Sequence, residues 1–344
     1  MREIDGSYGE GGGQLLRTSV ALAAITGQAV HVYNVRAKRA NPGLAPQHLA
    51  AVKAVAAICG AEAEGLEVKS REIKFWPGPL RGGHFDFPVG TAGSITLVLQ
   101  AALPVAIACR EKLRMTITGG TDVRAAPPLD YLRHVLLPLL SSMGARAKID
   151  LLGRGYYPRG GGRVAVEVEP SPPLRPLVLD ASGPRTEIRG YAHISGLPAH
   201  IVQRMTDTAL AELSIFSPPI IDLAETGADE AFGPGGAIVL VAQTERTRLG
   251  ASGIAQRGIR AEQLGSEAGQ HLREEILSGA TLDIHAADQI LIYLALAGGS
   301  SCFLARSLSS HAATTIWLLE QFLPVRFDIS QTDRLIRVKA EPAI

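Results

Sequence analysis

The chain has 344 residues and a net charge of +1, and 46% of its residues are hydrophobic against 19% charged. This composition is typical of a folded protein and excludes a largely disordered one. The near-zero charge argues against a broad basic surface for long nucleic acids, whereas 27 arginines beside seven lysines leave room for a local phosphate site. A chain of this length is expected to form two domains.

Nothing in the sequence indicates a membrane segment or a bound zinc ion. The longest apolar run, residues 95–109, is interrupted by Thr96, Gln100 and Pro104 and is too short for a membrane span. Residues 1–6 lack the apolar core of a signal peptide, so we expect a cytoplasmic protein without a membrane partner. The three cysteines form no Cys-x-x-Cys pair, which argues against a structural zinc site.

Three segments of the chain show the same order of predicted elements: a helix, a strand, a second helix and a strand pair. The first segment has helices over 14–26 and 46–59, a strand over 30–35 and a strand pair around 66–75. The second has a helix that follows 91–94 and ends at 108, a strand over 113–118, a helix over 128–143 and a hairpin over 147–169. The third has helices over 286–297 and 312–322, a strand over 301–305 and a hairpin over 325–329 and 335–340.

This repetition predicts units that each consist of a four-stranded sheet with two helices on one face. Such a unit cannot bury enough apolar area alone, so three units are expected to pack around an axis. Between the second and third segments, residues 185–279 show a different order of strand, helix, two strands and helix. We therefore predict a mixed α/β (α+β) fold, with a three-unit core domain over 1–184 and 280–344 and an inserted smaller α/β domain over 185–279.

A glycine-rich loop, residues 6–14, leads directly into the first predicted helix, with Arg17 inside that helix. Free backbone N–H groups at a helix start suit a phosphate, although a tight packing turn is the alternative interpretation. The loop matches neither the Walker A pattern nor the dinucleotide-binding pattern. Glu10 favours the phosphate interpretation. A carboxylate among phosphate-binding amides would repel the phosphates unless it holds a metal ion that the phosphates share.

A basic loop, residues 34–48, joins the strand and the second helix of the first segment. Such a run of charges is often only solvated. Its predicted position at the same end of the unit as the glycine-rich loop supports a second interpretation, in which Arg36, Arg39 and Gln47 clamp a terminal phosphate.

Two histidines lie where helices of the third segment begin. His311 precedes the second helix, in the loop equivalent to 45–46 and 127–128 of the other segments. A lone histidine there is ordinarily a cap or a surface residue, but threefold packing would bring the equivalent loops together. A neutral imidazole at a helix start then offers a nucleophilic nitrogen. His285 and Asp288 open the first helix, where Asp288 is either a helix-capping acid or a contact to a ribose or metal.

Taken together, these motifs resemble those of the RNA 3′-terminal phosphate cyclase family. The resemblance rests on residues 6–17, 36–44 and 310–315, and it extends over the whole chain. The repeated unit is also similar to that of the enolpyruvyl transferases, which contain six copies.

The resemblance implies an ATP-dependent, ligase-type enzyme that converts an RNA 3′-phosphate into a 2′,3′-cyclic phosphodiester. A histidine attacks ATP and releases pyrophosphate, the AMP passes to the RNA 3′-phosphate, and the neighbouring 2′-OH then displaces AMP. His311 matches the nucleophile, and Glu10 matches an acid near the ATP phosphates and a divalent metal, Mg or Mn. The residues that match positions near the triphosphate or RNA end are Arg17, Arg36, Arg39 and Gln47. The residues that match the adenosine pocket are Gln100, Pro127, His285, Ala286, Ala287, Asp288 and Gln289.

One residue departs from the family pattern, which has a tyrosine where this chain has His285. Histidine offers less stacking area, so we expect a relaxed nucleotide preference. Two alternative functions are a cyclase-like ribosome-assembly factor without catalysis, which lacks the nucleophilic histidine, and an enolpyruvyl-type transferase. The presence of His311 argues against both, and the three repeats argue against the second.

Overall fold

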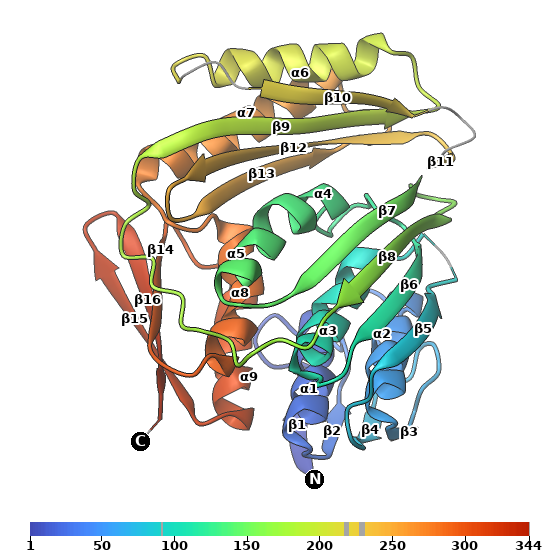
Figure 1. Cartoon of the computed structure of the whole chain (residues 1–344). Coiled ribbons are helices and arrows are strands. Elements are labelled where there is room, and N and C mark those ends of the chain that lie inside the picture. Colours follow the sequence, from blue (N-terminus) through green and yellow to red (C-terminus); the bar gives the residue numbers. More distant parts are fainter. Residues whose placement is uncertain (91, 217–219, 227–230, 344) are drawn as a thin grey trace.

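A computed structural model describes residues 1–90, 92–216, 220–226 and 231–343, so the predicted helix lead-in at Thr91 lies outside the described residues. Within these ranges the chain forms four sheets with helices packed between and upon them (Figure 1). The predicted mixed α/β class is therefore confirmed. No helix in the described ranges is long and apolar enough to cross a membrane.

In the described part of the chain the first sheet has four strands, the predicted number, in the order β1-β2-β4-β3; the predicted segments omit β1, and β3 precedes the strand pair predicted around 66–75. Its strands are β1 (Arg2–Asp5), β2 (Val30–Tyr33), β3 (Glu62–Glu64) and β4 (Ile73–Trp76). Helices α1 (Gly13–Thr26) and α2 (Pro46–Cys59) pack against each other, and α1 also contacts β2 and β4. Alternate strand residues such as Val30, Val32 and Phe75 are fully buried, which is typical of a sheet covered on one face.

The second sheet has five strands among the described residues, in the order β11-β7-β8-β6-β5, instead of the predicted four. Its strands are β5 (Gly83–Pro88), β6 (Leu113–Gly119), β7 (Ala147–Gly155), β8 (Gly162–Val168) and β11 (Ala231–Phe232). The extra strand β11 comes from the 185–279 segment and pairs with β7 in parallel. A strand of two residues has no recognisable period in the sequence, so the pairing could not be predicted. In the folded chain, β11 pairs with the edge of β7 that would otherwise be free.

Helices also cover the second sheet, but one of them is irregular. Helix α3 (Ile95–Ala108) agrees with the prediction, whereas the helix expected over 128–143 is divided into α4 (Leu129–Tyr131), a π-helical turn η1 (Leu132–Leu136) and α5 (Leu137–Ser142). Pro138 explains the irregularity, because it has no backbone N–H to continue the regular ladder.

The third sheet has three strands in the part that the structure describes, in the order β14-β16-β15, where the sequence predicts four. They are β14 (Ser301–Ala305), β15 (Val325–Thr332) and β16 (Leu335–Pro342), with helices α8 (Ile284–Leu296) and α9 (Ser310–Phe322). A fourth position is taken by Val178, which forms only an isolated parallel bridge with Cys302. Pro176, two residues before Val178, cannot donate a ladder hydrogen bond, so the strand is not extended in that direction.

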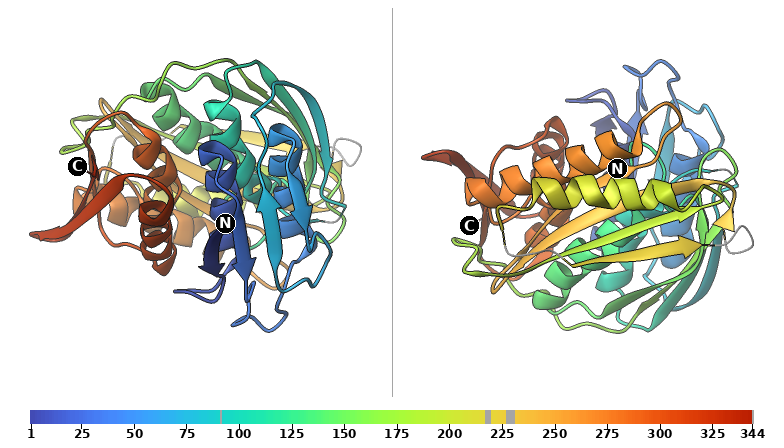
Figure 2. Two further views of the ribbon diagram at one scale, coloured as in Figure 1. Left: turned by 90° about the horizontal axis from the view of Figure 1, so that it is seen from below. Right: turned by 90° about the horizontal axis from the view of Figure 1, so that it is seen from above.

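Residues 185–279 form the fourth sheet, in the order β10-β9-β12-β13, with two helices packed together on one face (Figure 2). Its elements are β9 (Arg185–Ser195), α6 (His200–Glu212), β10 (Ile220–Thr226), β12 (Gly235–Thr244), β13 (Arg248–Ile254) and α7 (Ala261–Ser278). The sequence pattern missed β13. Side chains of β12 alternate between two cores: Ile238 and Leu240 pack under α6 and α7, whereas Val239 and Val241 join the main core.

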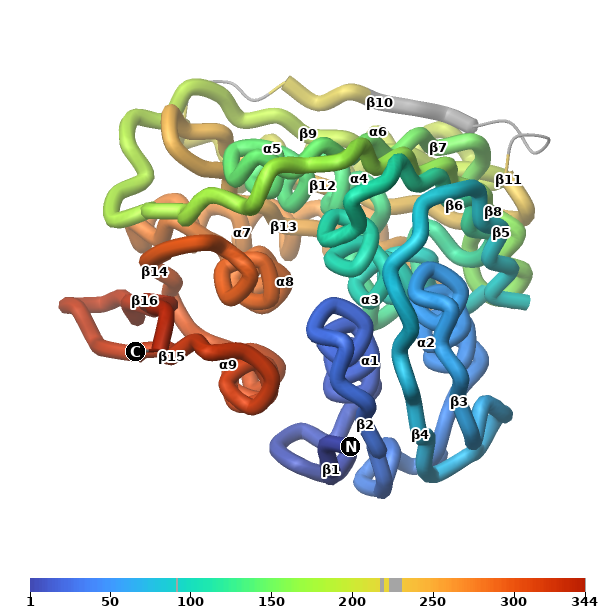
Figure 3. Tube along the Cα trace, turned by 60° about the horizontal axis from the view of Figure 1, so that its bottom comes forward, coloured from blue at the N-terminus to red at the C-terminus, as the bar shows by residue number. Residues whose placement is uncertain are grey.

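The helices of the three remaining sheets gather at the centre of the molecule. Helix α1 contacts α2, α3 and α9, and α8 contacts both α3 and α9. Figure 3 shows α1 between α9 and α2. This arrangement brings together helix starts that are up to three hundred residues apart in the sequence.

Candidate active site

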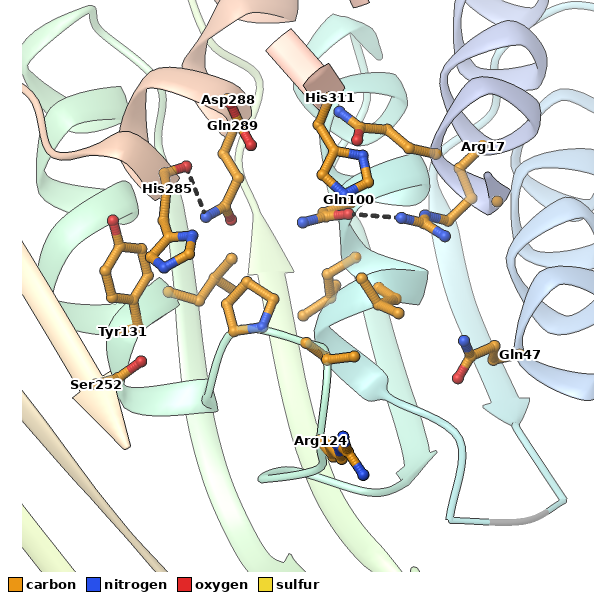
Figure 4. A pocket seen from close by; sticks show the side chains of 18 of the residues that line it. Arg17, Gln47, Gln100, Arg124, Tyr131, Ser252, His285, Asp288, Gln289 and His311 are labelled. Atoms are coloured by element: carbon orange, nitrogen blue, oxygen red, sulfur yellow. Dashed lines mark hydrogen bonds between the residues drawn. The ribbon is translucent and has the colours of Figure 1, made fainter. Parts of the chain in front are cut away.

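The starts of helices α1, α2, α3, α8 and α9 line one cavity of about 750 Å³ (Figure 4). The cavity is lined at these helix starts by Gln14, Gln47, Leu97, His285 and His311, respectively. The first N–H groups of a helix have no partner within the helix, and the helix dipole makes that end positive. Several such ends around one cavity favour an anionic ligand, above all phosphate groups.

Arg17 supplies a buried positive charge to this cavity. Its side chain projects from α1, the residue is only 6% exposed, and Nη2 donates a 3.0 Å hydrogen bond to Oε1 of Gln100. Its Nε has no hydrogen-bond partner within the described residues. Burial lowers the pKa of Arg17 to about 10, which leaves it charged at neutral pH. A buried cation without a carboxylate partner is costly, so an anionic ligand would compensate it.

Glu10 lies between a cation and the predicted nucleophile. Its Oε1 pairs with Nη2 of Arg39, and its Oε2 pairs with Nδ1 of His311. The backbone on both sides of Glu10 is left-handed, with φ of 57° at Gly9 and 61° at Gly11, a conformation that glycine adopts without strain. The glycine-rich loop therefore turns the carboxylate towards α9.

His311 stands in the first turn of α9, whose N-cap is Ser309. The hydroxyl of Ser309 accepts a 3.0 Å hydrogen bond from the N–H of Ala312 and donates to both carboxylate oxygens of Asp288. Burial lowers the pKa of His311 below its ordinary 6.5. Nearby cations lower this pKa further, whereas Asp288 raises it. A neutral imidazole whose Nδ1 faces a carboxylate carries its proton on Nδ1 and has a free lone pair on Nε2.

The remaining sequence-predicted residues of the adenosine pocket divide into two groups. Gln100, Pro127, His285, Asp288 and Gln289 line the cavity. In contrast, Ala286 and Ala287 are fully buried in α8 and do not line it. Asp288 holds the α9 cap, and burial raises the pKa of its carboxyl.

His285 and Gln289 lie on the side of the cavity away from Arg17 (Figure 4). The His285 ring meets the Tyr131 ring edge-on, with centroids 6.1 Å apart, and Nε2 of Gln289 donates to the His285 carbonyl at 3.1 Å. The Oε1 atom of Gln289 is buried and has no hydrogen-bond partner in the described part of the chain.

The basic loop also reaches the cavity, and all three of its predicted residues line it. Nη1 of Arg36 donates to the carbonyls of Asn41 and Gly43 at 2.9 and 2.8 Å, so part of its guanidinium holds the loop together. Arg39 pairs with Glu10 as described, and Gln47 accepts a 3.4 Å hydrogen bond from the N–H of Ser94.

Comparison with known proteins shows to which family this chain belongs. Residues 8–329 match the sequence pattern of the family described as RNA 3′-terminal phosphate cyclase. The RNA 3′-terminal phosphate cyclase of Nitrosospira multiformis is 72% identical over 342 residues, which cover 99% of this chain and 97% of the relative. Those of Methanopyrus kandleri and Pyrococcus furiosus are 45% and 44% identical, each covering 95% of this chain and 94% of the relative. The chain belongs to the RNA 3′-terminal phosphate cyclase family.

In this member of the cyclase family, the cavity also includes residues that sequence reasoning missed. The largest group comes from the 185–279 segment and consists of Ser252, Gly253, Ile254, Gln256, Ile259, Leu264 and Glu267. No motif signals this contribution, because it depends on how the fourth sheet packs over α4 and α8. Other cavity residues outside the predicted set include Gln14, Arg124, Tyr131 and Thr315.

His48 is a further omission, and its sequence signal was present. It follows Gln47 at the start of α2, is 4% exposed and lines the cavity. Burial, Arg17 and Arg36 lower the pKa of His48 to about 3, so its ring is neutral. A histidine next to a predicted phosphate contact could have been included on position alone.

Proposed function

We propose that this chain is an RNA 3′-terminal phosphate cyclase, which uses ATP to convert an RNA 3′-phosphate into a 2′,3′-cyclic phosphodiester. One observation carries the proposal: the His311 imidazole, disfavoured as a cation and paired through Nδ1 with Glu10, lines the same cavity as Arg17, which has no carboxylate partner among the described residues. A nucleophilic nitrogen next to helix starts and a buried arginine suits attack on a nucleoside triphosphate.

The first step forms a bond between Nε2 of His311 and the α-phosphorus of ATP, while the bond to pyrophosphate breaks. The imidazole becomes cationic, and Glu10 at Nδ1 stabilises that charge. Arg17 and the helix starts stabilise the negative charge that develops on pyrophosphate. This arrangement assigns Glu10 a role beyond the one predicted from its motif.

In the second step an oxygen of the RNA 3′-phosphate attacks the phosphorus of histidinyl-AMP, and the phosphorus–nitrogen bond breaks. In the third, the 2′-oxygen bonds to the 3′-phosphorus and its proton passes to solvent, while the bond from that phosphorus to the AMP oxygen breaks and AMP leaves. Adenylylation thus replaces a poor oxide leaving group with AMP. Arg36, Arg39 and Gln47 lie on the glycine-loop side of the cavity and are proposed to bind the terminal phosphate.

His285, Asp288, Gln289, Gln100 and Pro127 are proposed to form the nucleoside side. The His285 ring, edge-on to Tyr131, offers a face to a base, and the unpartnered Oε1 of Gln289 offers a hydrogen-bond acceptor. The small imidazole face retains the expectation of a relaxed base preference.

We also propose that Glu10 contributes one ligand to a divalent metal, Mg or Mn, when ATP is bound. The described residues contain no group of three His, Cys, Asp or Glu side chains that could hold a metal ion. A single carboxylate fits an ion that takes its other ligands from phosphates and water, as Mg²⁺ commonly does. Such an ion would neutralise charge on the phosphates.

The three sheets around the central helices are inferred to be copies of one unit, forming a core domain over 1–184 and 280–344. In support, each sheet contains a parallel pair: β1 with β2, β5 with β6, and Val178 with β14. The second member of each pair is joined in antiparallel fashion to a later strand, which is β4, β8 or β16. Residues 185–279 are proposed as an inserted domain, because they enclose a separate apolar cluster.

Covalent labelling tests the function. Wild-type protein, incubated with ATP labelled at the α-phosphate and a divalent metal, should carry an acid-labile label through denaturing electrophoresis, and His311→Ala should carry none. Addition of a 3′-phosphate RNA should discharge the label and yield a cyclic end. His200→Ala, at an exposed position of α6 outside the cavity, is the matched control and should label normally.

Wild-type protein that takes up no label with either metal would contradict the proposal and favour the non-catalytic alternative. Labelling of His311→Ala at the wild-type level would instead exclude His311 as the nucleophile.

A further inference from the structure

Asp283 is a buried carboxylate at the nucleotide side of the cavity, and it does not line the cavity itself. The residue is 1% exposed and is the N-cap of α8. Its Oδ1 accepts hydrogen bonds from the Tyr131 hydroxyl at 2.6 Å and from the N–H groups of His285 and Ala286 at 2.9 and 3.1 Å. Its Oδ2 accepts from the N–H of Gly250 at 2.7 Å.

These donors belong to three separate parts of the chain. Tyr131 ends α4 of the second segment, His285 opens α8 of the third, and Gly250 lies in β13 of the 185–279 segment. Each part also supplies a wall of the cavity, through Tyr131 itself, His285 and Ser252. Figure 4 shows these three side chains on the same side of the cavity. A single carboxylate therefore connects the three surfaces that surround the nucleoside side.

Helix capping alone does not account for an aspartate at this position. Serine caps both α3 and α9, where Ser94 and Ser309 each accept a single backbone N–H. A carboxylate has two oxygens and about four acceptor positions, so it can cap the helix and hold two further donors. Within the described residues Asp283 has no arginine or lysine partner, and its buried charge is compensated by these donors alone.

The packing around Asp283 is close enough to fix the spacing of the walls. A Cβ atom at Gly250 would lie 2.6 Å from Cε2 of Tyr131, so β13 runs directly against that ring. Burial, reinforced by the Asp283 charge, raises the pKa of Tyr131 well above its usual range, which keeps the hydroxyl protonated as a donor. The ring, the strand and the helix start are thus held at one set of positions.

We propose that Asp283 is the positioning residue of the nucleotide side, which sets the spacing between the Tyr131 and His285 rings and Ser252 of the 185–279 segment. The proposal rests on the proposed function for the identity of the ligand. It makes the 185–279 segment a structural part of ATP recognition. It also predicts that loss of the carboxylate weakens ATP binding while the later transfer of AMP to RNA continues.

The test compares Asp283→Asn, Tyr131→Phe and the double variant in two assays. The first is calorimetric titration of ATP into proteins that also carry His311→Ala, which measures binding without covalent chemistry. The second uses proteins with His311 intact, adenylylated and freed of ATP, and follows a single turnover of a 3′-phosphate RNA. Glu275→Gln is the control for loss of a neighbouring buried carboxylate: Glu275 is 3% exposed and pairs with Arg306, and its charge acts on Asp283 and Tyr131, but within the described residues it has no hydrogen bond to Tyr131, His285 or Gly250.

We expect Asp283→Asn to raise the Kd for ATP about tenfold, because the charge is lost and one of the two acceptor oxygens becomes an amide NH2 that cannot accept a hydrogen bond. Tyr131→Phe should raise the Kd less. In the double variant, the factor by which the Kd rises should not exceed the product of the two single factors, because both substitutions affect the same hydrogen bond. The single-turnover rate should stay within about twofold of wild type, and Glu275→Gln should match wild type in both assays.

An unchanged Kd for ATP in Asp283→Asn would overturn the proposal. It would also be overturned if Asp283→Asn and Glu275→Gln lost ATP affinity and single-turnover rate to the same extent. If Asp283→Asn does not fold, Tyr131→Phe decides the question, because it removes one hydroxyl from Asp283 and must still weaken ATP binding. Absence of covalent label in wild type would refute the proposed function, whereas the calorimetric result would still support or refute the role of Asp283.

Discussion

At the scale of single residues, the site depends on how protons are placed on its histidines. His311 and His48 both line the cavity, and burial lowers the pKa of both. The charges of Arg17 and Arg36 also act on His48. Its Nδ1 accepts a hydrogen bond from the N–H of Ala45, so this nitrogen has a structural role at the start of α2. His311 differs from His48 in that a carboxylate, Glu10, faces its Nδ1, which leaves Nε2 for reaction.

This difference predicts the pH dependence of covalent labelling. The neutral form of His311 is the nucleophile, and its pKa lies below 6.5, so labelling should be complete near pH 7 and be lost as the pH falls through the lowered pKa. The measurement is the second-order rate of labelling at low ATP from pH 4.5 to 8, which reports the pKa of the free enzyme. An acidic limb with its midpoint at or above 6.5 would contradict the prediction.

At the scale of elements, the site depends on how closely α1 and α2 approach. The first residue of α1 is Gly13, which lies against the His48 ring in the first turn of α2. A side chain at Gly13 would overlap that ring. Because Gln14 and Arg17 follow on α1 and Gln47 precedes His48 on α2, this contact sets the width of the phosphate side of the cavity.

Gly13→Ala should therefore lower both stability and activity. Overpacking a buried contact costs about 1–3 kcal/mol, so the free energy of unfolding should fall by about that amount. Urea unfolding and covalent labelling measure the two effects. Gly298→Ala is the control, because a Cβ there meets no atom within 4 Å. Equal behaviour of the two variants would show that α1 and α2 separate without cost.

At the scale of the whole molecule, a buried ionic network joins the second sheet to the 185–279 segment. Arg154 of β7 donates to Oδ2 of Asp122 at 3.1 Å and to Oδ2 of Asp130 at 2.7 Å. His193 of β9 lies 3.5 Å from the same Asp122 oxygen. Burial alone would raise the pKa of Asp122, but His193, Arg154 and Thr121 outweigh it and hold that pKa below its usual value. Asp122 and Asp130 flank the loop that carries Arg124 and Pro127 into the cavity.

Removal of the central cation should strongly destabilise the fold. Arg154→Met removes the cation that the buried carboxylates Asp122 and Asp130 share, which costs about 3–5 kcal/mol. Urea unfolding at pH 7 measures the change. Arg189→Met, which breaks the exposed pair with Glu187, should cost at most about 1 kcal/mol. A similar cost for both variants would mean that water or another cation replaces Arg154.

Much of the architecture could be predicted from local pattern. The helix over 46–59 and the strand over 301–305 begin and end where the periodicity indicated, because the 3.6 and 2 residue periods are properties of neighbouring residues. The motifs around Glu10, Arg36 and His311 also stood out, since glycine, arginine and histidine have distinctive chemistry at helix starts. These signals were sufficient to predict the family that the comparisons confirm.

Other features depended on contacts between distant residues. The pairing of Glu10 with His311, the addition of β11 to the second sheet and the cavity wall formed by Ser252 each join segments that are far apart in the sequence. No local period encodes such contacts, because they arise only when buried surfaces and unpaired strand edges meet in the folded chain. The chemistry of the candidate nucleophile therefore follows from its residue type and local motif, whereas the groups that surround it follow from the packing of distant segments.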